Sequence, residues 1–162
     1  DSLSILPVEQ TLVVLPGTVD AGRAKVLFES GFDRVELRAT RTGDPEHQFA
    51  VLREAGFRTV GFELPELSGY RNMADLVQRL EPDHLVLACR PEDGLPGYFE
   101  YLPHHFCRPG HECRHLLDVA AGQDSAGFGP GAASRIGTTV LYNPRSCEAW
   151  AKAIRSGRAR AT

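Results

Sequence analysis

The sequence predicts an α/β protein whose mainly parallel sheet is built from alternating βα units, as a half-barrel or a flavodoxin-like layer. Two observations lead to this fold class. Short apolar runs recur about every 25 residues, and the stretches between them have the apolar spacing of helices. Strands that alternate with helices in this way are joined by right-handed crossovers and lie parallel to one another.

Four apolar runs are the expected strands of this sheet. Each run is short and rich in Val, Leu or Phe, which is typical of strands buried between two layers. The runs are "TLVVLP" at 11–16, "RVELRA" at 34–39, "RTVGFEL" at 58–64 and "DHLVLAC" at 83–89.

The stretches between these runs are the expected helices. The first places Ala24 and Leu27 on one face and ends at a glycine, Gly31. The second begins with Asp44 as N-cap, and a proline follows at the first helical position, where its missing N–H costs nothing. The third covers 70–82, has apolar residues at helical spacing and ends at a proline.

The C-terminal third is predicted to be irregular. Residues 1–91 contain the regular βα units, and 92–137 are rich in Pro and Gly, which predicts a long loop with one short helix near 111–122. Residues 138–162 contain a fifth strand and a C-terminal helix. A length of 162 residues predicts that these parts form a single domain.

Composition excludes several classes of partner. The formal net charge of −3 gives no positive field that would attract nucleic acid. The sequence contains no run of 18 apolar residues, so no membrane span is expected. The four cysteines are too few and too unevenly spaced for the disulfide framework of a secreted protein. A reduced, cytoplasmic protein without nucleic-acid or membrane partners is therefore expected.

The segment "HHFCRPGHECRH" at 104–115 predicts a metal site, with zinc or another transition metal bound. Imidazole and thiolate are the ligands that zinc prefers, and two of the histidines are spaced i, i+4 on the expected helix. The predicted ligands are Cys107, His111, His115 and one of His104 or Cys113. The alternative is a polar loop whose histidines are solvated or bonded to the backbone.

A thiol function is a further alternative. Arg108, Arg114 and the nearby imidazoles would stabilise a thiolate, so Cys107 and Cys113 would act as an attacking and resolving pair in a thiol-dependent enzyme or redox sensor. Cys89 is a separate catalytic candidate, because it ends a predicted strand, where parallel sheets place reactive groups. A packing role for Cys89 is the competing interpretation.

Two carboxylates interrupt the apolar strands. Glu36 and Glu63 would be costly to bury unless they face a polar cavity, a cation or water, so they predict a shared polar pocket. With a bound metal, such a pocket would suit a metal-dependent hydrolase or lyase in which a glutamate takes a proton from water. The alternative is that one of the two faces solvent on an edge strand.

Residues 34–91 resemble the EAL family, barrel domains that cleave cyclic di-GMP. A Glu-bearing strand, a helix opened by Asp-Pro, an "LREAGFR" turn, an acidic strand and "GY" follow in that family's order. The resemblance matches Glu36 to a metal-binding glutamate and places Glu63 near paired aspartates, whereas Val86 and Ala88 replace a lysine and an aspartate. It implies a degenerate barrel that does not hydrolyse cyclic di-GMP. Such a barrel would be a non-catalytic sensor or interaction module for a small-molecule ligand or protein partner.

Overall fold

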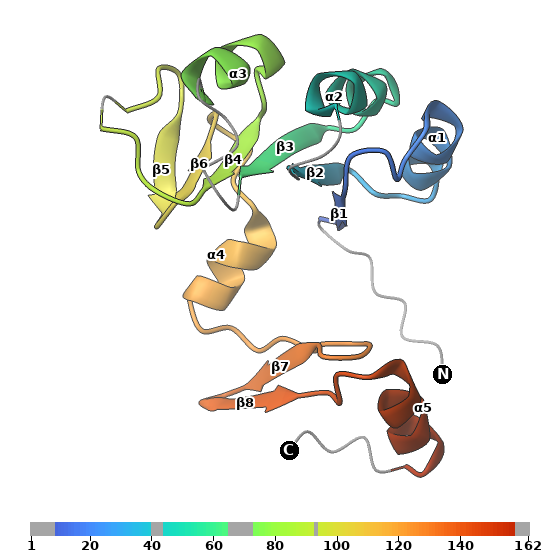
Figure 1. Ribbon diagram of the computed structural model, residues 1–162. Helices are drawn as coiled ribbons and strands as arrows, with labels where there is room; N and C mark the ends of the chain where they lie inside the picture. Colours follow the sequence, from blue (N-terminus) through green and yellow to red (C-terminus); the bar gives the residue numbers. More distant parts are fainter. Residues whose placement is uncertain (1–8, 40–43, 65–72, 93, 158–162) are drawn as a thin grey trace. The chain divides into compact units, whose positions relative to one another are not determined.

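The computed structural model describes residues 9–39, 44–64, 73–92 and 94–157 (Figure 1). The chain divides into two compact units, Asp1–Glu112 and Cys113–Thr162, and each unit is described by itself. The single domain expected for the whole chain stays a prediction. The expected start of the third helix at 70–72 and the "PELSGY" stretch at 65–70 lie outside the described residues.

The first unit contains a six-stranded sheet in the order β1-β2-β3-β4-β6-β5. Neighbouring strands from β1 to β4 are parallel, and helices α1 to α3 connect them. The predicted fold class, a mainly parallel sheet with alternating βα units, is therefore confirmed. The elements are β1 (Thr11–Val14), α1 (Ala21–Glu29), β2 (Arg34–Arg38), α2 (Pro45–Glu54), β3 (Thr59–Leu64), α3 (Met73–Leu80), β4 (His84–Leu87), β5 (Phe99–Leu102) and β6 (His105–Cys107).

The two faces of this sheet differ in polarity. Helices α1, α2 and α3 all lie over one face (Figure 1), and Val35, Leu37, Val60, Phe62 and Leu85 belong to the buried core there. Side chains alternate between the faces along a strand, so the residues between these point the other way. We call that opposite side the polar face. Its side chains include Arg34, Glu36, Arg38, Thr59, Glu63, His84, His105 and Cys107.

Local sequence signals set the helix ends. Asp20 and Asp44 cap α1 and α2, since Oδ1 of each accepts a hydrogen bond from the backbone N–H of Arg23 (2.8 Å) and His47 (3.0 Å), respectively. Gly31 follows α1 with φ of 97°, a conformation that glycine adopts without strain. The predicted cap at Asp44 and the predicted stop at Gly31 are both present.

The predicted long loop contains a hairpin. Strand β6 pairs antiparallel with β4, and β5 pairs with β6 at the edge of the sheet. The turn between them includes His104, whose φ is 66°. Phe106 of β6 is 5% exposed and belongs to the core. Burying such a side chain contributes about 1.5–3 kcal/mol, so it favours a paired strand over the loop that the surrounding Pro and Gly predicted.

The second unit has a helix, a two-stranded antiparallel sheet and a helix. Its elements are α4 (Arg114–Ala120), β7 (Ala133–Ile136), β8 (Thr139–Tyr142) and α5 (Cys147–Arg155). Ser146 caps α5, because its Oγ accepts a hydrogen bond from Ala149 N at 3.1 Å. The expected fifth strand and C-terminal helix are present, although the strand pairs with β7 and not with the large sheet.

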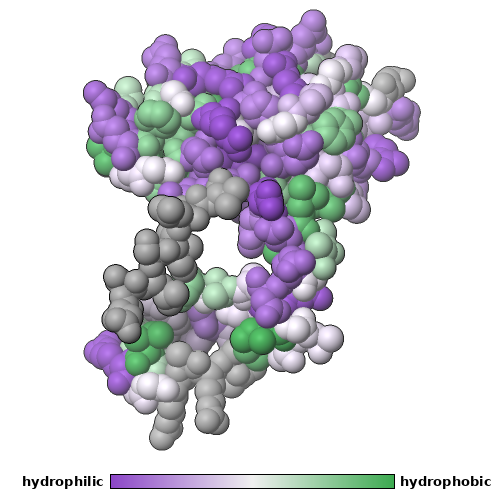
Figure 2. Space-filling model, turned by 180° about the vertical axis from the view of Figure 1, so that it is seen from behind, coloured by the Kyte–Doolittle hydropathy of each residue, from purple (hydrophilic) through white to green (hydrophobic). Residues whose placement is uncertain are grey.

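The surface of the first unit is mostly hydrophilic on the side that Figure 2 shows, with small and scattered hydrophobic areas. In the part of the chain that the structure describes, no helix has the length and apolar composition to cross a membrane.

Candidate functional site

The candidate site lies on the polar face and centres on Glu36. Its carboxylate is buried, and Oε1 accepts a hydrogen bond from Arg34 Nε at 2.8 Å. Gly61 is its neighbour on β3, and a Cβ atom there would overlap the carboxylate. The missing side chain of Gly61 therefore leaves the space that Glu36 fills. The paired guanidinium offsets much of the cost of burying this charge.

His84 extends the cluster from Glu36 to strand β5. Its Nδ1 lies 2.9 Å from Glu36 Oε1, although the angle there is too poor for a hydrogen bond, so we treat the contact as a close electrostatic pair. Its Nε2 lies 2.8 Å from the Tyr101 hydroxyl. The ring of His105 stacks beside that of His84 with centroids 5.8 Å apart. Four strands, β2, β4, β5 and β6, thus bring one carboxylate, two imidazoles and a phenol together.

A β-bulge brings Tyr101 into this cluster. The pairing of β5 with β6 shifts between Glu100 and Leu102, so Tyr101 is the extra residue of the edge strand. Bulges of this kind redirect a side chain and are frequent next to functional sites. The ring of Tyr101 meets that of His105 edge-on, with centroids 6.1 Å apart.

Several buried polar atoms of the cluster make no hydrogen bond to any described residue. They are Glu36 Oε2, His84 Nδ1 and His105 Nδ1. Buried polar atoms in native proteins nearly always have a partner, which is protein, water or ligand. Their concentration in one cluster on the polar face marks it as a place where a polar ligand or water completes the structure.

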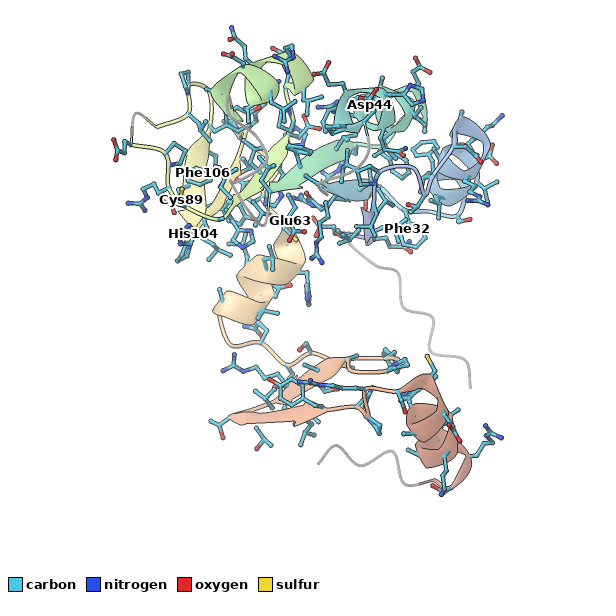
Figure 3. All side chains as sticks on the ribbon, in the orientation of Figure 1. Phe32, Asp44, Glu63, Cys89, His104 and Phe106 are labelled. Carbon is cyan, nitrogen blue, oxygen red and sulfur yellow. The ribbon has the colours of Figure 1, made fainter. Side chains whose placement is uncertain are left out.

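One histidine of the polar face has a shifted pKa, and the second predicted carboxylate lies on the same face. Burial, and to a lesser extent the neighbouring His84, lower the pKa of His105 below its ordinary value, so its imidazole is neutral at pH 7. Glu63 lies on the side of the sheet away from the helices (Figure 3), and its Oε2 accepts a hydrogen bond from Arg38 Nε at 2.8 Å. Glu36 and Glu63 therefore share one face, while their catalytic role stays a prediction.

The structure separates the predicted metal ligands of the first unit. Cys107 is buried in β6, whereas His104 is exposed in the hairpin turn, where its backbone N–H donates to Glu100 Oε1 at 2.9 Å. His111 lies before the start of helix α4, and its Nδ1 lies 3.0 Å from Thr59 Oγ1. These three predicted ligands have different surroundings and different partners.

The remaining two predicted ligands belong to the second unit. Helix α4 begins at Arg114, so His111 and His115 are not on one helix and the expected i, i+4 pairing is wrong. Cys113 is the N-cap residue of α4. Among the described residues, no group of three or more His, Cys, Asp or Glu is placed to hold a metal ion. The zinc site is therefore not supported.

The surroundings of Cys107 do not suit the thiol function that the sequence suggested. Burial raises the pKa of the Cys107 thiol to about 11, and the nearby Glu112 carboxylate acts in the same direction, while the lowering effect of Arg34 is smaller. A thiol with so high a pKa is a poor nucleophile at pH 7. Cys89 is exposed beyond the end of β4 (Figure 3), and its proposed catalytic role stays a prediction.

Part of this chain resembles a curated protein in sequence. No family model matches it. Over 78 residues it is 37% identical to the protein named heme chaperone HemW of Mycobacterium tuberculosis, in the strains CDC 1551 / Oshkosh and H37Rv. The match covers 45% of this chain and 20% of the relative, so it spans about a fifth of that protein.

A solved structure has the same fold. It is the HemN protein of Escherichia coli, described as a coproporphyrinogen III oxidase and a radical SAM enzyme. The TM-score is 0.69 at 20% identity, and the match covers 94% of this chain and 50% of that one. Identity at this level establishes a shared fold and nothing more about activity.

These comparisons correct the expected family, function and cofactor. The sequence similarity is to HemW and the structural similarity to HemN, so the resemblance to EAL domains is wrong, and so is the sensor module derived from it. The zinc-dependent hydrolase or lyase and the thiol enzyme have no support from these relatives either. An iron–sulfur cluster takes several cysteine thiolates, and no described group in this chain offers them, so no cluster chemistry is assigned to it.

Sequence reasoning missed most of the cluster. Arg34 and His84 are polar residues within apolar strands, and their alternation with Val35 and Leu85 was a signal that could have placed them opposite the core. Tyr101 had no such signal, because its position depends on a bulge in a strand that was not predicted.

Proposed function

We propose that this chain is part of a heme-handling protein and that its polar face binds heme or a closely related tetrapyrrole. The observation that carries the proposal is the set of buried polar atoms around Glu36 that lack a hydrogen-bond partner among the described residues. The similarity to HemW suggests which ligand completes them. This chain spans only part of the length of its relatives. Heme handling by the whole protein is therefore also a proposal. A cytoplasmic location is proposed too, supported by the small number and uneven spacing of the four cysteines, which do not suit the disulfide framework of a secreted protein.

The chemistry of the polar face suits such a ligand. Proteins hold heme iron through His, Tyr, Cys or Met side chains, and this face presents two imidazoles and a phenol. Arg38 is about half exposed at the carboxyl end of β2, where its guanidinium could pair with a carboxylate of the ligand.

Titration of the full chain with hemin tests the proposal. We expect saturable binding of one hemin per chain, with a shifted Soret band. His105→Ala should weaken binding about tenfold, which corresponds to about 1.4 kcal/mol of lost contact. His47→Ala is the matched control, because His47 is exposed on α2 and lies away from the polar face. Hemin binding that does not saturate, or that both variants retain equally, would contradict a site on the polar face.

A further inference from the structure

We propose that a cavity beside helix α3 binds a free α-amino acid with a large apolar side chain. The cavity has a volume of about 320 Å³. It lies on the helix-covered side of the sheet, because Val77 belongs to the core there, and Leu95 and Tyr98 pack against that core. No residue of the polar face lines the cavity, so the proposal is independent of heme binding.

Two segments of the chain form apolar walls. On α3, Ala74, Val77 and Gln78 are spaced i, i+3 and i+4, so they lie along one face of the helix. The segment that leads into β5 forms the facing wall, with the side chains of Leu95 and Tyr98. Pockets of a few hundred Å³ that combine apolar walls with a few polar groups are typical of small-molecule sites.

The aromatic wall is held in place by neighbouring groups. The Tyr98 hydroxyl donates a hydrogen bond to the Pro82 carbonyl oxygen at 2.6 Å. Burial raises the pKa of Tyr98, so the phenol keeps the proton that it donates. The Arg108 guanidinium lies over the ring, with its carbon 5.6 Å from the ring centroid. A wall fixed in this way loses little conformational freedom when a ligand binds.

Two opposite charges lie together on the lining of this cavity. Arg108 Nη2 is 3.7 Å from Glu81 Oε1, which is too far for a good hydrogen bond. The side chains are 38% and 69% exposed, and ion pairs of this kind contribute little to stability. Both groups therefore retain the capacity to form charge-assisted hydrogen bonds with a ligand.

This pair of charges selects the chemistry of the ligand. A ligand with only a carboxylate would be repelled by Glu81, and one with only an ammonium would be repelled by Arg108. A zwitterion satisfies both, with its carboxylate at the guanidinium and its ammonium at the glutamate. An α-amino acid carries its two charges on adjacent groups, as the short separation of Arg108 and Glu81 requires. Residues within a peptide lack these charges, because both groups are part of amide bonds.

The apolar walls select the side chain of the amino acid. A volume of about 320 Å³ equals that of about ten water molecules in the liquid, which suits a ligand of about a dozen non-hydrogen atoms. Phenylalanine has that size, and its ring would contact Val77 and Leu95. Small or polar amino acids would leave this apolar surface uncovered and should bind more weakly.

Titration of the isotope-labelled full chain with L-phenylalanine, followed by nuclear magnetic resonance, tests the proposal. We expect saturable shifts of the amide signals of α3 and of 94–98, with a Kd of about 1 mM or lower. Two analogues separate the charges, since 3-phenylpropionate lacks the ammonium and 2-phenylethylamine lacks the carboxylate. Each should bind at least about tenfold more weakly, because one charge of the protein then has no counterpart.

Variants of the lining residues give a second test. Arg108→Gln and Glu81→Gln should each weaken binding of L-phenylalanine at least about tenfold. Ala74→Trp should abolish it, because the indole fills the cavity from the exposed side of α3. Arg79→Gln is the matched control and should change nothing, since Arg79 is bonded to Glu46 and does not line the cavity.

Three results would overturn the proposal. They are the absence of saturable shifts up to about 10 mM L-phenylalanine, equal affinity for either analogue, and wild-type affinity in Arg108→Gln or Glu81→Gln. The comparison of the analogues uses the wild-type protein, so it does not depend on the folding of any variant. None of these results bears on hemin binding by the polar face.

Discussion

Removal of the Glu36 carboxylate should strongly destabilise the protein. Arg34 is completely buried and would lose the carboxylate that lies 2.8 Å from its guanidinium. Removing one partner of a buried ion pair costs about 3–5 kcal/mol, because the remaining charge stays buried without compensation. Arg34 keeps two other partners, because its Nη1 lies 3.8 Å from Glu9 Oε2 and donates a hydrogen bond to the His111 carbonyl oxygen. We therefore expect Glu36→Ala to lower the free energy of unfolding by about 3 kcal/mol, near the lower end of that range.

Urea unfolding followed by far-ultraviolet circular dichroism measures this loss. Glu46→Ala is the matched control, since Glu46 pairs with Arg79 at 2.9 Å on the surface and such pairs contribute about 0–1 kcal/mol. The double variant Arg34→Met, Glu36→Leu should recover part of the stability, because it removes both charges of this pair, although the buried carboxylate of Glu9 then loses the guanidinium beside it. A loss below about 1 kcal/mol for Glu36→Ala, or a double variant less stable than the single one, would refute the reasoning.

Three further predictions follow from the same cluster and its surroundings. Gly61→Ala should lower the melting temperature and weaken hemin binding together, because the new methyl group overlaps the carboxylate beside it; equal stability of variant and wild type would contradict this close approach. Cys89 and Cys147 should react with iodoacetamide at pH 8 while Cys107 stays unmodified by mass spectrometry, since Cys107 is buried and its pKa is raised to about 11; rapid labelling of Cys107 would count against its burial. The lowered pKa of His105 means that the unfolded chain binds more protons than the folded one as pH falls below the ordinary histidine value. Stability should therefore decrease from pH 7 to pH 5, and less so in His105→Asn; an identical pH dependence of the two proteins would exclude this histidine as the cause.

The sequence was sufficient for the first half of the fold. The strands at 34–39 and 58–64 and the helix capped by Asp44 depend on local patterns, namely buried apolar runs and cap residues, and the structure has all of them. The hairpin β5–β6 was missed, because its stability comes from pairing with β4 and from burial of Phe106 in a core built by distant residues. Such long-range contacts leave little trace in the local composition.

The site was predicted less well than the fold. The sequence did single out Glu36, because a carboxylate within an apolar strand requires a polar partner, and this residue is buried in the structure. The dense histidines and cysteines at 104–115 led instead to a metal site, since ligand type and spacing in sequence do not reveal strand register. In the structure His105 points to the polar face, while His104 lies in a turn. One residue of register separates a member of the cluster from a surface residue.

The contact between Glu36 and Gly61 has a consequence for how the two positions can change over generations. Because the carboxylate occupies the volume of a missing side chain, Gly61 cannot gain a side chain while Glu36 is kept. A relative that acquires a larger residue at the position of Gly61 should already have lost the acid at the position of Glu36, and it would then also have lost the partner of His84. We expect the two positions to co-vary as a pair, so that a protein with a side chain at the glycine position has a different ligand chemistry on the same sheet.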